Sequence, residues 1–303
     1  MGESAVIAGQ LFNGISVGSI LLLAALGLAL SFGVMDVINM AHGELLMVGG
    51  YLSYLVCRFV HGPYAFLIAL IVAFIGTALL GALLEVSVIC WLYGRPLDTL
   101  IATWGISLIL QQAARSIFGA IGVEVTAPEW LDGSVTLNHG FLAGVSLPYV
   151  RLFMIVLAAV VLGLVWLFIV RTRWGMLLRA VHQDRSMADV LGVNTRLVDL
   201  AVFALGSGVA GIAGSALALI SPVTPTVGQS YIVYAFLVVI VGGIGSLLGT
   251  ALAALLVGLF SASMQIFTSV SFADVLLLVM VVVFIQFRPR GIVARRGRAM
   301  EEA

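Results

Sequence analysis

Apolar residues fill this chain in long blocks, and short polar stretches separate them. A helix needs roughly 20 residues to cross a bilayer, and most of the blocks have about that length. The blocks at 43–60 and 231–245 are short and rich in glycine, so we interpret them as broken or re-entrant helices. The pattern predicts an all-α, polytopic membrane protein of eight or nine segments in a single transmembrane domain, 1–303. The predicted segments are 7–33, 43–60, 64–91, 97–119, 150–170, 199–221, 231–245, 246–267 and 273–287.

The distribution of arginine predicts the orientation. Most arginines lie in the loop at about 171–198 and in the tail at 288–303, whereas the acidic loop at about 121–149 has none. Because positively charged loops stay on the cytoplasmic side, we expect the first two stretches to be cytoplasmic and the third to be extracytoplasmic. This orientation requires three segments between 231 and 287. Two long spans with a buried kink are the alternative.

A pair of glycines occurs in both halves of the chain. Gly43 and Gly49 recur as Gly243 and Gly249, and each pair follows a stretch that contains valine and isoleucine. Interrupted helices at corresponding positions of two halves are typical of transporters built from inverted repeats. We therefore expect an inverted repeat.

The composition excludes several classes of function. Hydrophobic residues make up 62% of the chain and charged residues 9%, against roughly 25% charged residues in a soluble domain. The formal net charge is zero, which argues against a nucleic-acid partner and leaves membrane lipid as the surrounding medium. The chain has no lysine for a GxxxxGK[ST] phosphate loop, so it cannot bind and hydrolyse ATP in that manner by itself. Cys57 and Cys90 lack metal-ligand spacing, and we expect neither a cofactor nor a metal on this chain.

Polar residues interrupt the apolar pattern at Asn39, His42, Gly43 and Glu44. Inside a bilayer such side chains are costly unless they are paired or face water. His42 and Glu44 are two positions apart, which directs them to different faces of a helix and argues against a metal site. Two interpretations stay open. Asn39 caps the helix that follows, or a broken helix borders a substrate path here.

A second polar pattern lies in the segment predicted over 97–119. Thr103, Ser107 and Gln111 are spaced four residues apart and line one stripe of a helix, with Trp104 beside them. Hydroxyl and amide groups suit a small neutral ligand, but polar stripes also serve helix packing. The candidate substrate-path residues are Asn39, His42, Gly43, Glu44, Thr103, Trp104, Ser107, Gln111, Gly242 and Gly243.

Two further features allow more than one interpretation. Glu85 lies inside an apolar block, where an ionisable group is a functional candidate, or it pairs with Arg95 or Arg115. The stretch from about Arg185 to Leu191 has the pattern of a short amphipathic helix that ends at Gly192. Such a helix lies on the lipid surface or docks into a groove of a cytoplasmic partner.

Three motifs together resemble the branched-chain amino acid and urea permease family of ATP-binding-cassette importers. They are INMAHGEL at 38–45, the loop pattern over 175–193 and the glycine string over 241–250, and the resemblance extends from about Leu11 to Arg290. It implies a permease of the bacterial inner membrane with a cytoplasmic C-terminus. It also implies three kinds of partner, namely a homologous second permease subunit, two cytoplasmic ATPase subunits and an extracytoplasmic solute-binding protein. The residues that the resemblance assigns to ATPase coupling are Gly175, Arg179, Ala180, Arg185, Met187, Ala188 and Gly192.

Within this family the stretches 95–112, 127–131 and 181–188 are similar to the urea branch, so urea or a related short amide is the expected substrate. Tyr234 stands where that branch is expected to have an acidic residue, and branched-chain amino acid import is the alternative. A passive urea or amide channel would need no partner. A membrane-embedded enzyme would need an acid–base or metal constellation, which the sequence does not show. We therefore expect a transport subunit and not an enzyme.

Overall fold

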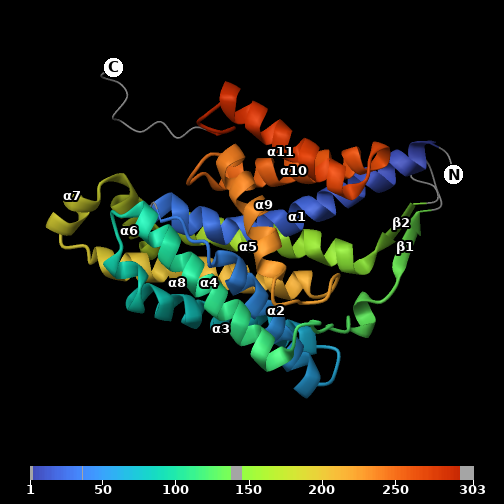
Figure 1. Ribbon diagram of the computed structural model, residues 1–303, viewed down its shortest axis with the longest axis horizontal. Helices are drawn as coiled ribbons and strands as arrows, with labels where there is room; N and C mark the ends of the chain where they lie inside the picture. The colour runs from blue at the N-terminus through green and yellow to red at the C-terminus, as the bar shows by residue number, and fades with distance from the viewer. Residues whose placement is uncertain (1–2, 36, 138–144, 294–303) are drawn as a thin grey trace.

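The computed structural model describes residues 3–35, 37–137 and 145–293. Residues 138–144 of the expected extracytoplasmic loop and residues 294–303 of the expected tail lie outside this part. Every predicted segment appears as a helix, and 231–287 divides into three helices, as predicted (Figure 1). The helices are α1 (Glu3–Met35), α2 (His42–Phe59), α3 (Ala65–Ser87), α4 (Pro96–Phe118), α5 (Tyr149–Arg171), α6 (Arg173–Gln183), α7 (Arg185–Val190), α8 (Thr195–Leu217), α9 (Val227–Gly242), α10 (Leu247–Phe267) and α11 (Val270–Phe287), with the single turns η1 (Ile89–Trp91) and η2 (Glu129–Leu131).

The helices differ in how well they suit a membrane. Six of the described helices are long and apolar enough to cross one, namely α1, α3 with η1, α5, α8, α10 and α11. Helix α9 is apolar but shorter. Helices α2 and α4 do not belong to this group because polar residues interrupt them, and the candidates His42, Glu44, Thr103, Ser107 and Gln111 are among these polar residues.

Helices α1 and α8 form the centre of the bundle. Helix α1 packs against α10, α8, α9 and α5, and α8 also packs against α3 and α2 (Figure 1). Leu23, Leu26 and Leu28 of α1 are fully buried. A helix that is apolar on all sides is surrounded by other helices or by lipid, and α1 is surrounded by helices over most of its length.

Glycines bring the backbone of α2 into contact with its neighbours. A Cβ atom on Gly49 would lie 2.3 Å from the backbone oxygen of Gly211 in α8, and one on Gly214 would lie 1.8 Å from that of Leu46 in α2. Small residues permit this close approach of helices in membranes. The inverted repeat stays a prediction.

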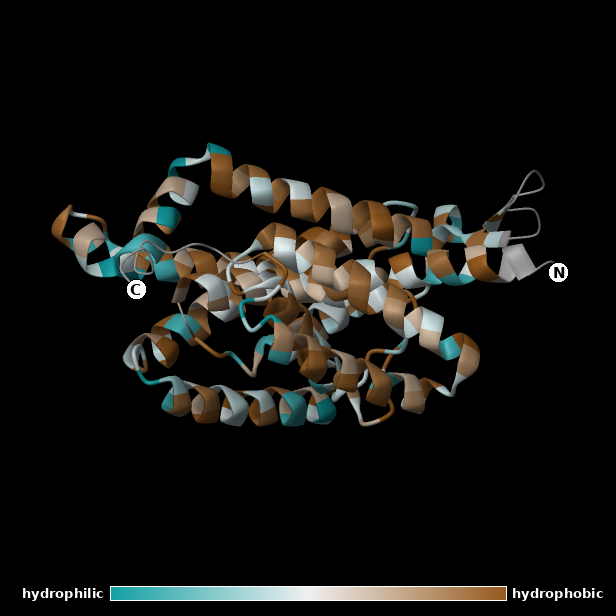
Figure 2. Cartoon of the chain, turned by 90° about the horizontal axis from the view of Figure 1, so that it is seen from above, coloured by the Kyte–Doolittle hydropathy of each residue, from teal (hydrophilic) through white to brown (hydrophobic). Residues whose placement is uncertain are grey.

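Opposite ends of the bundle carry the two polar connections. Strands β1 (Ser134–Leu137) and β2 (Val145–Pro148) pair antiparallel and lie near the start of α1, while α6 and α7 lie at the far end (Figure 1). We name these the hairpin end and the arginine-rich end. Figure 2 shows apolar residues along the helices and hydrophilic residues mostly toward the ends and in the connections. The arginine-rich loop and the acidic loop are thus on opposite sides, as the charge pattern predicts.

Candidate functional site

The start of α2 lies inside the bundle rather than at its end. The Nε2 atom of His42 is 3.1 Å from the backbone oxygen of Ala24. Ala24 precedes the end of α1 by about three helical turns, or ~16 Å. Residues 37–41 therefore run back along α1 before α2 begins, which agrees with the interpretation of this segment as a re-entrant helix.

Asn39 does not cap α2, which corrects one of the two open interpretations. The N-cap residue is Ala41, and no side chain caps the helix. The Oδ1 atom of Asn39 instead accepts a hydrogen bond from the backbone N–H of Ala41 at 3.0 Å, which closes the turn before the helix. Asn39 and His42 are both buried and bonded to backbone atoms, so they fix where α2 begins.

Polar side chains of α4 bond to Glu44 of α2 and to the turn that precedes α2. Ser107 Oγ and Gln111 Nε2 donate to Glu44 Oε1 at 3.0 and 2.8 Å. One turn earlier on α4, Thr103 Oγ1 accepts from the backbone N–H of Met40 at 3.1 Å. All four side chains are buried, with Glu44 only 1% exposed. We name Glu44, Thr103, Ser107 and Gln111 the polar cluster. The predicted stripe of α4 therefore faces the predicted polar motif of α2.

One oxygen of the polar cluster has no partner. Glu44 Oε2 is buried and makes no hydrogen bond, while Oε1 accepts both donors. A buried carboxylate is expensive unless a cation or several donors compensate its charge. Among the residues that the structure describes, the ion pair within 4 Å is Arg185–Asp199, and Glu44 takes no part in it. The charge of Glu44 therefore has no counterpart within the described part of the chain.

Trp104 lies outside the polar cluster, although the sequence groups it with the stripe. It is 51% exposed on the outer side of α4, together with Ile101 and Leu108. Positions 103 and 104 are about 100° apart around a helix. Trp104 therefore faces lipid or another subunit, and the structure does not bring it together with Thr103, Ser107 and Gln111.

Gly242 and Gly243 also lie apart from the polar cluster. Gly228, near the start of α9, touches Gly43 of α2, and Gly242 is about 21 Å farther along the helix. Gly242 accepts a hydrogen bond from the backbone N–H of Val293 at 3.2 Å. These glycines permit close packing at the end of α9, and a place for them in a substrate path stays a prediction.

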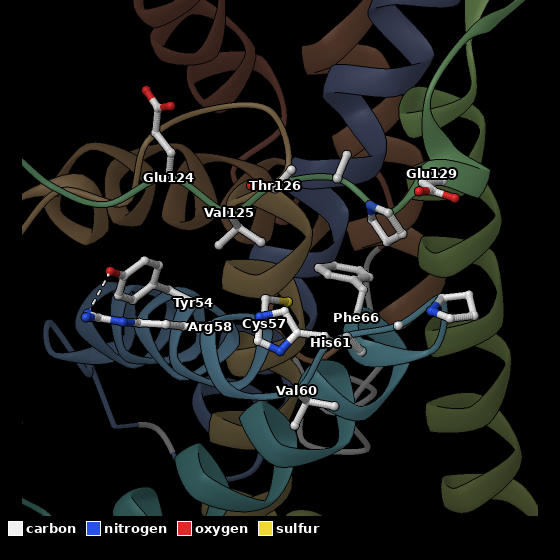
Figure 3. A pocket seen from close by; sticks show the side chains of 15 residues that line it. Tyr54, Cys57, Arg58, Val60, His61, Phe66, Glu124, Val125, Thr126 and Glu129 are labelled. Atoms are coloured by element: carbon white, nitrogen blue, oxygen red, sulfur yellow. Dashed lines mark hydrogen bonds between the residues drawn. The ribbon is translucent and has the colours of Figure 1, made fainter.

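A large cavity opens near the hairpin end. It has a volume of about 620 Å³ and lies between the end of α2 and the segment 124–129 (Figure 3). Tyr54, Arg58 and His61 line it from one side, and the Tyr54 hydroxyl accepts a hydrogen bond from Arg58 Nη1 at 3.2 Å. The wall combines apolar, basic and acidic groups, as a vestibule for a zwitterionic or polar solute would.

A smaller cavity of about 280 Å³ lies toward the arginine-rich end. It is lined by residues of α1, α4 and the connections, among them Tyr93, Thr99 and Arg185. Thr99 is 1% exposed and precedes Thr103 by four residues, so it extends the same stripe of α4. The same four-residue spacing that identified Thr103, Ser107 and Gln111 in the sequence would also have identified Thr99. A continuous polar stripe therefore leads from the smaller cavity to Glu44.

An aromatic pair separates the polar cluster from the larger cavity. The rings of Tyr51 and Phe118 are stacked, with centroids 4.2 Å apart and planes inclined by 14°. Tyr51 follows Glu44 on α2 by two helical turns, and Phe118 follows Gln111 on α4 by the same interval. The pair therefore closes the space between α2 and α4 on the hairpin side. Sequence reasoning missed it, although the equal spacing from the polar residues was a usable signal.

The loop at 171–198 forms two helices rather than the single one expected. Thr172 caps α6 by accepting from the Gly175 backbone N–H at 3.1 Å. A Cβ atom on Gly175 would lie 2.1 Å from the backbone oxygen of Ile169, and Arg179 donates to that same oxygen. Gly175 and Arg179 thus fold α6 back onto the end of α5.

Helix α7 projects from the arginine-rich end. Asp184 caps it by accepting from the Met187 backbone N–H at 2.9 Å, and this bond lowers the pKa of the Asp184 carboxyl. Gly192, two residues after the helix, has the left-handed φ of 85°, as the sequence predicts. Ala188 is buried, whereas Met187, Val190 and Leu191 are 57%, 83% and 76% exposed. Ala180, Arg185 and Gly192 are exposed as well. This apolar tip suits contact with a partner.

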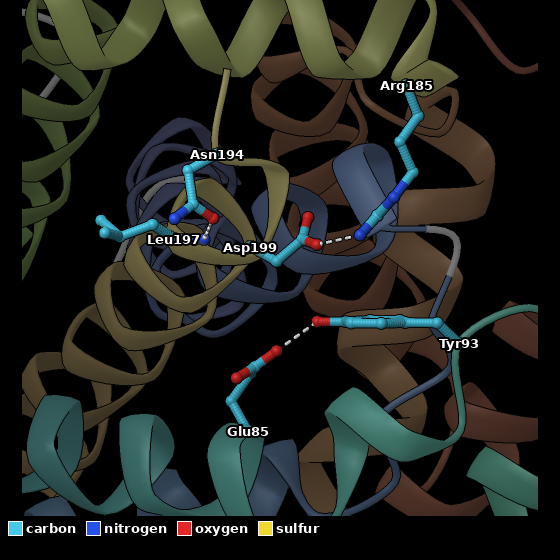
Figure 4. A network of polar contacts seen from close by, with 6 residues as sticks. All are labelled: Glu85, Tyr93, Arg185, Asn194, Leu197 and Asp199. Atoms are coloured by element: carbon cyan, nitrogen blue, oxygen red, sulfur yellow. Dashed lines mark hydrogen bonds and ion pairs between the residues drawn. The ribbon is translucent and has the colours of Figure 1, made fainter. Parts of the chain in front are cut away.

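A charged network holds α7 to the bundle. Arg185 Nη2 lies 2.5 Å from Asp199 Oδ2, and its guanidinium lies 5.0 Å from the centroid of the Tyr93 ring (Figure 4). The Tyr93 hydroxyl donates to Glu85. Glu85 therefore bonds to Tyr93 rather than to Arg95 or Arg115, which corrects one of the two open interpretations of Glu85. Sequence reasoning missed Tyr93 and Asp199 as partners, because the network joins four separate elements.

Comparison with known proteins finds similarity to transport permeases along nearly the whole chain. The family model described as the permease component of branched-chain amino acid transport systems matches residues 10–285. The high-affinity branched-chain amino acid permease protein BraD of Pseudomonas aeruginosa is 30% identical over 294 residues, covering 94% of this chain and 95% of BraD. LivH of Escherichia coli K12, with the same description, is 26% identical with the same coverage. A probable permease of this kind from Methanocaldococcus jannaschii is 25% identical and covers 86% of this chain and 80% of its own length. No solved structure matches the chain significantly.

Proposed function

Because this chain belongs to the family of permease components of branched-chain amino acid transport systems, we propose that it carries branched-chain amino acids across the bacterial inner membrane. The observation that carries the proposal is the family match over residues 10–285, which includes both helices of the polar cluster. BraD and LivH are described as branched-chain amino acid permeases and match over nearly their full lengths. The chain is therefore the membrane-spanning subunit of an ATP-binding-cassette importer.

The comparisons favour the amino acid alternative over the expected urea substrate. The similarity of 95–112 to the urea branch is not supported by the family model or by the relatives described above. Tyr234, which departs from the expected urea pattern, agrees with this result. The buried carboxylate of Glu44 points the same way, because urea carries no charge and a free amino acid carries an ammonium group.

The substrate path in this proposal runs between α2 and α4. The polar cluster lies between the two cavities, and the aromatic pair of Tyr51 and Phe118 separates it from the larger one. Substrate delivered by an extracytoplasmic binding protein enters the larger cavity at the hairpin end. It then passes the polar cluster when α4 separates from α2, and it leaves along the stripe toward Thr99. This is alternating access around a site within the membrane.

The arginine-rich end is the cytoplasmic end in this proposal, and α6 and α7 transmit the motion of the ATPases. Support comes from the arginine content of this end and from the exposed apolar tip of α7. Two cytoplasmic ATPase subunits, a second permease subunit and the binding protein complete the importer. ATP is bound and hydrolysed by the partner ATPases and not by this chain.

The test is reconstitution of the complete importer in liposomes with ATP inside and the binding protein outside. We expect ATP-dependent uptake of labelled leucine, isoleucine or valine and no uptake of labelled urea. Liposomes that contain this chain alone are the control, because a passive channel would conduct without partners. Uptake of urea but not of leucine by the complete importer would contradict the proposal.

A further inference from the structure

Glu44 differs from the other buried carboxylates, Asp199 and Glu85, in the partners that compensate its charge. Asp199 is fully buried, but the guanidinium of Arg185 lies 2.5 Å away and neutralises it. Glu85 accepts from the Tyr93 hydroxyl in the same network. Glu44 has two neutral donors on Oε1 and nothing on Oε2. A buried carboxyl group that lacks a counter-charge either takes up a proton or pairs with a cation, so Glu44 can pair with a cation that is supplied from elsewhere.

The described part of the chain does not supply that partner. All basic residues other than histidine are arginines, and none is within ion-pair distance of Glu44 in the described structure. The imidazole of His42 bonds to the Ala24 backbone oxygen of α1. A cation that pairs with Glu44 therefore comes from outside the described part of this chain.

From these contacts we propose that Glu44 Oε2 binds the α-ammonium group of the transported amino acid. An ammonium group has three N–H donors. Glu44 Oε2 is the oxygen of the polar cluster that has no partner, whereas Thr103 Oγ1 accepts from the Met40 backbone N–H and Ser107 Oγ accepts from Gln111 Nε2 at 3.2 Å. Ser107 and Gln111 meanwhile hold Oε1 from α4, so the carboxylate stays oriented while its second oxygen is free. The inference rests on the proposed function, because it assigns a binding group to that same path.

The position of Glu44 in the first turn of α2 agrees with a site that binds a cation and then releases it during each transport cycle. The helix dipole stabilises a carboxylate at this position when no cation is bound, although the stabilisation is small. The site is therefore ready to accept a cation but is not permanently neutralised. A permanent arginine partner, as Asp199 has, would occupy the site and exclude the substrate.

Replacement of Glu44 by glutamine tests the charge separately from the shape. Glutamine has the size of glutamate and retains an oxygen for Ser107 and Gln111, but it cannot pair with an ammonium group. In the reconstituted importer, we expect Glu44→Gln to reduce leucine uptake at least about tenfold. Stimulation of ATP hydrolysis by the leucine-loaded binding protein should stay within about twofold of wild type, because the helices and the ATPase contacts are intact.

The outcomes separate this inference from the proposed function. If the wild-type importer does not take up leucine, the proposed function fails. If the wild type does so and Glu44→Gln takes up leucine equally well, the carboxylate is protonated or structural and the inference is overturned. Gln112→Ala, on the exposed side of α4, is the matched control and should behave as wild type.

A measurement on the unmodified importer guards against a variant that does not assemble. A hydrophobic carbodiimide modifies buried carboxyl groups in their protonated form and not when they pair with a cation, and mass spectrometry of the digested chain reports each site. We expect turnover with leucine to lower the modification of Glu44 and to leave that of Glu85 unchanged. Equal modification of Glu44 with and without leucine would refute the ammonium site.

Discussion

The two faces of α2 are built in opposite ways. Toward α8 and α9 the backbone of α2 touches theirs, and Gly49 has no room for a side chain beside Gly211. Toward α4 the contacts are hydrogen bonds between side chains, from Ser107 and Gln111 to Glu44. The first face joins α2 to the centre of the bundle, and the second joins it to a helix whose outer side is exposed.

This difference indicates which contact can change during transport. Close-packed backbones cannot slide without steric conflict, so α2 and α8 move together. A side-chain hydrogen bond contributes only about 1–3 kcal/mol net, and its donor can bond to a ligand instead. We therefore expect α2, α8 and α9 to form the fixed wall of the path and α4 to form the mobile one.

The largest effect should follow from breaking the fixed wall. In Gly49→Leu, the new side chain would begin with a Cβ atom 2.3 Å from the Gly211 oxygen. We expect a loss of more than about 3 kcal/mol of stability, and hence little monodisperse protein in detergent by size-exclusion chromatography. Gly105→Leu is the matched control, because a Cβ atom on Gly105 of α4 meets nothing within 4 Å. Equal yields of the two variants would show that the glycine face is not close-packed.

A smaller effect should follow from weakening the mobile wall. Gln111→Ala removes the shorter of the two hydrogen bonds to Glu44, at 2.8 Å, and exposes more of the carboxylate charge. We expect leucine uptake to fall at least about tenfold while the protein stays folded, in line with about 1.5–3 kcal/mol for one hydrogen bond to a charged group. Uptake assays and size-exclusion chromatography on the same preparations check both parts. A variant that fails to fold would mean that the α4 face is also part of the rigid core.

The smallest effect should follow from a change at the edge of the polar cluster. Thr103→Val keeps the shape of the side chain and removes the acceptor for the Met40 backbone N–H. We expect leucine uptake within about threefold of wild type, because one neutral hydrogen bond contributes about 1 kcal/mol or less. A loss as large as that of Glu44→Gln would place Thr103 at the centre of the binding site instead.

The sequence predicted the helices well because the length of an apolar block is a local property. It also predicted the stripe of Thr103, Ser107 and Gln111, because a spacing of four residues fixes a common face. Helix α6 was missed, since it is a short amphipathic helix without a long apolar block. The glycine-rich pattern at Gly242 and Gly243 did not by itself show whether these residues serve close packing at the end of α9 or line a substrate path.

Partners that are distant in sequence could not be predicted. Arg185 and Asp199 lie on different helices, and only the packing of α7 against α8 brings them together. The same holds for Glu44 and Gln111, whose hydrogen bond crosses from α2 to α4. The sequence identified both residues as unusual, but it did not show that they bind each other.

Linking α2 to α4 across the aromatic pair tests most directly whether substrate passes between these helices. Cysteines replace Tyr51 and Phe118, whose rings are stacked at 4.2 Å, in a background where Cys57 and Cys90 are serine. A short bis-thiosulfonate reagent then links the two positions. We expect linked importers to lose leucine uptake by at least about tenfold and to recover it on reduction, while either single cysteine variant is unaffected by the reagent. Full uptake by the linked importer would contradict a path between α2 and α4.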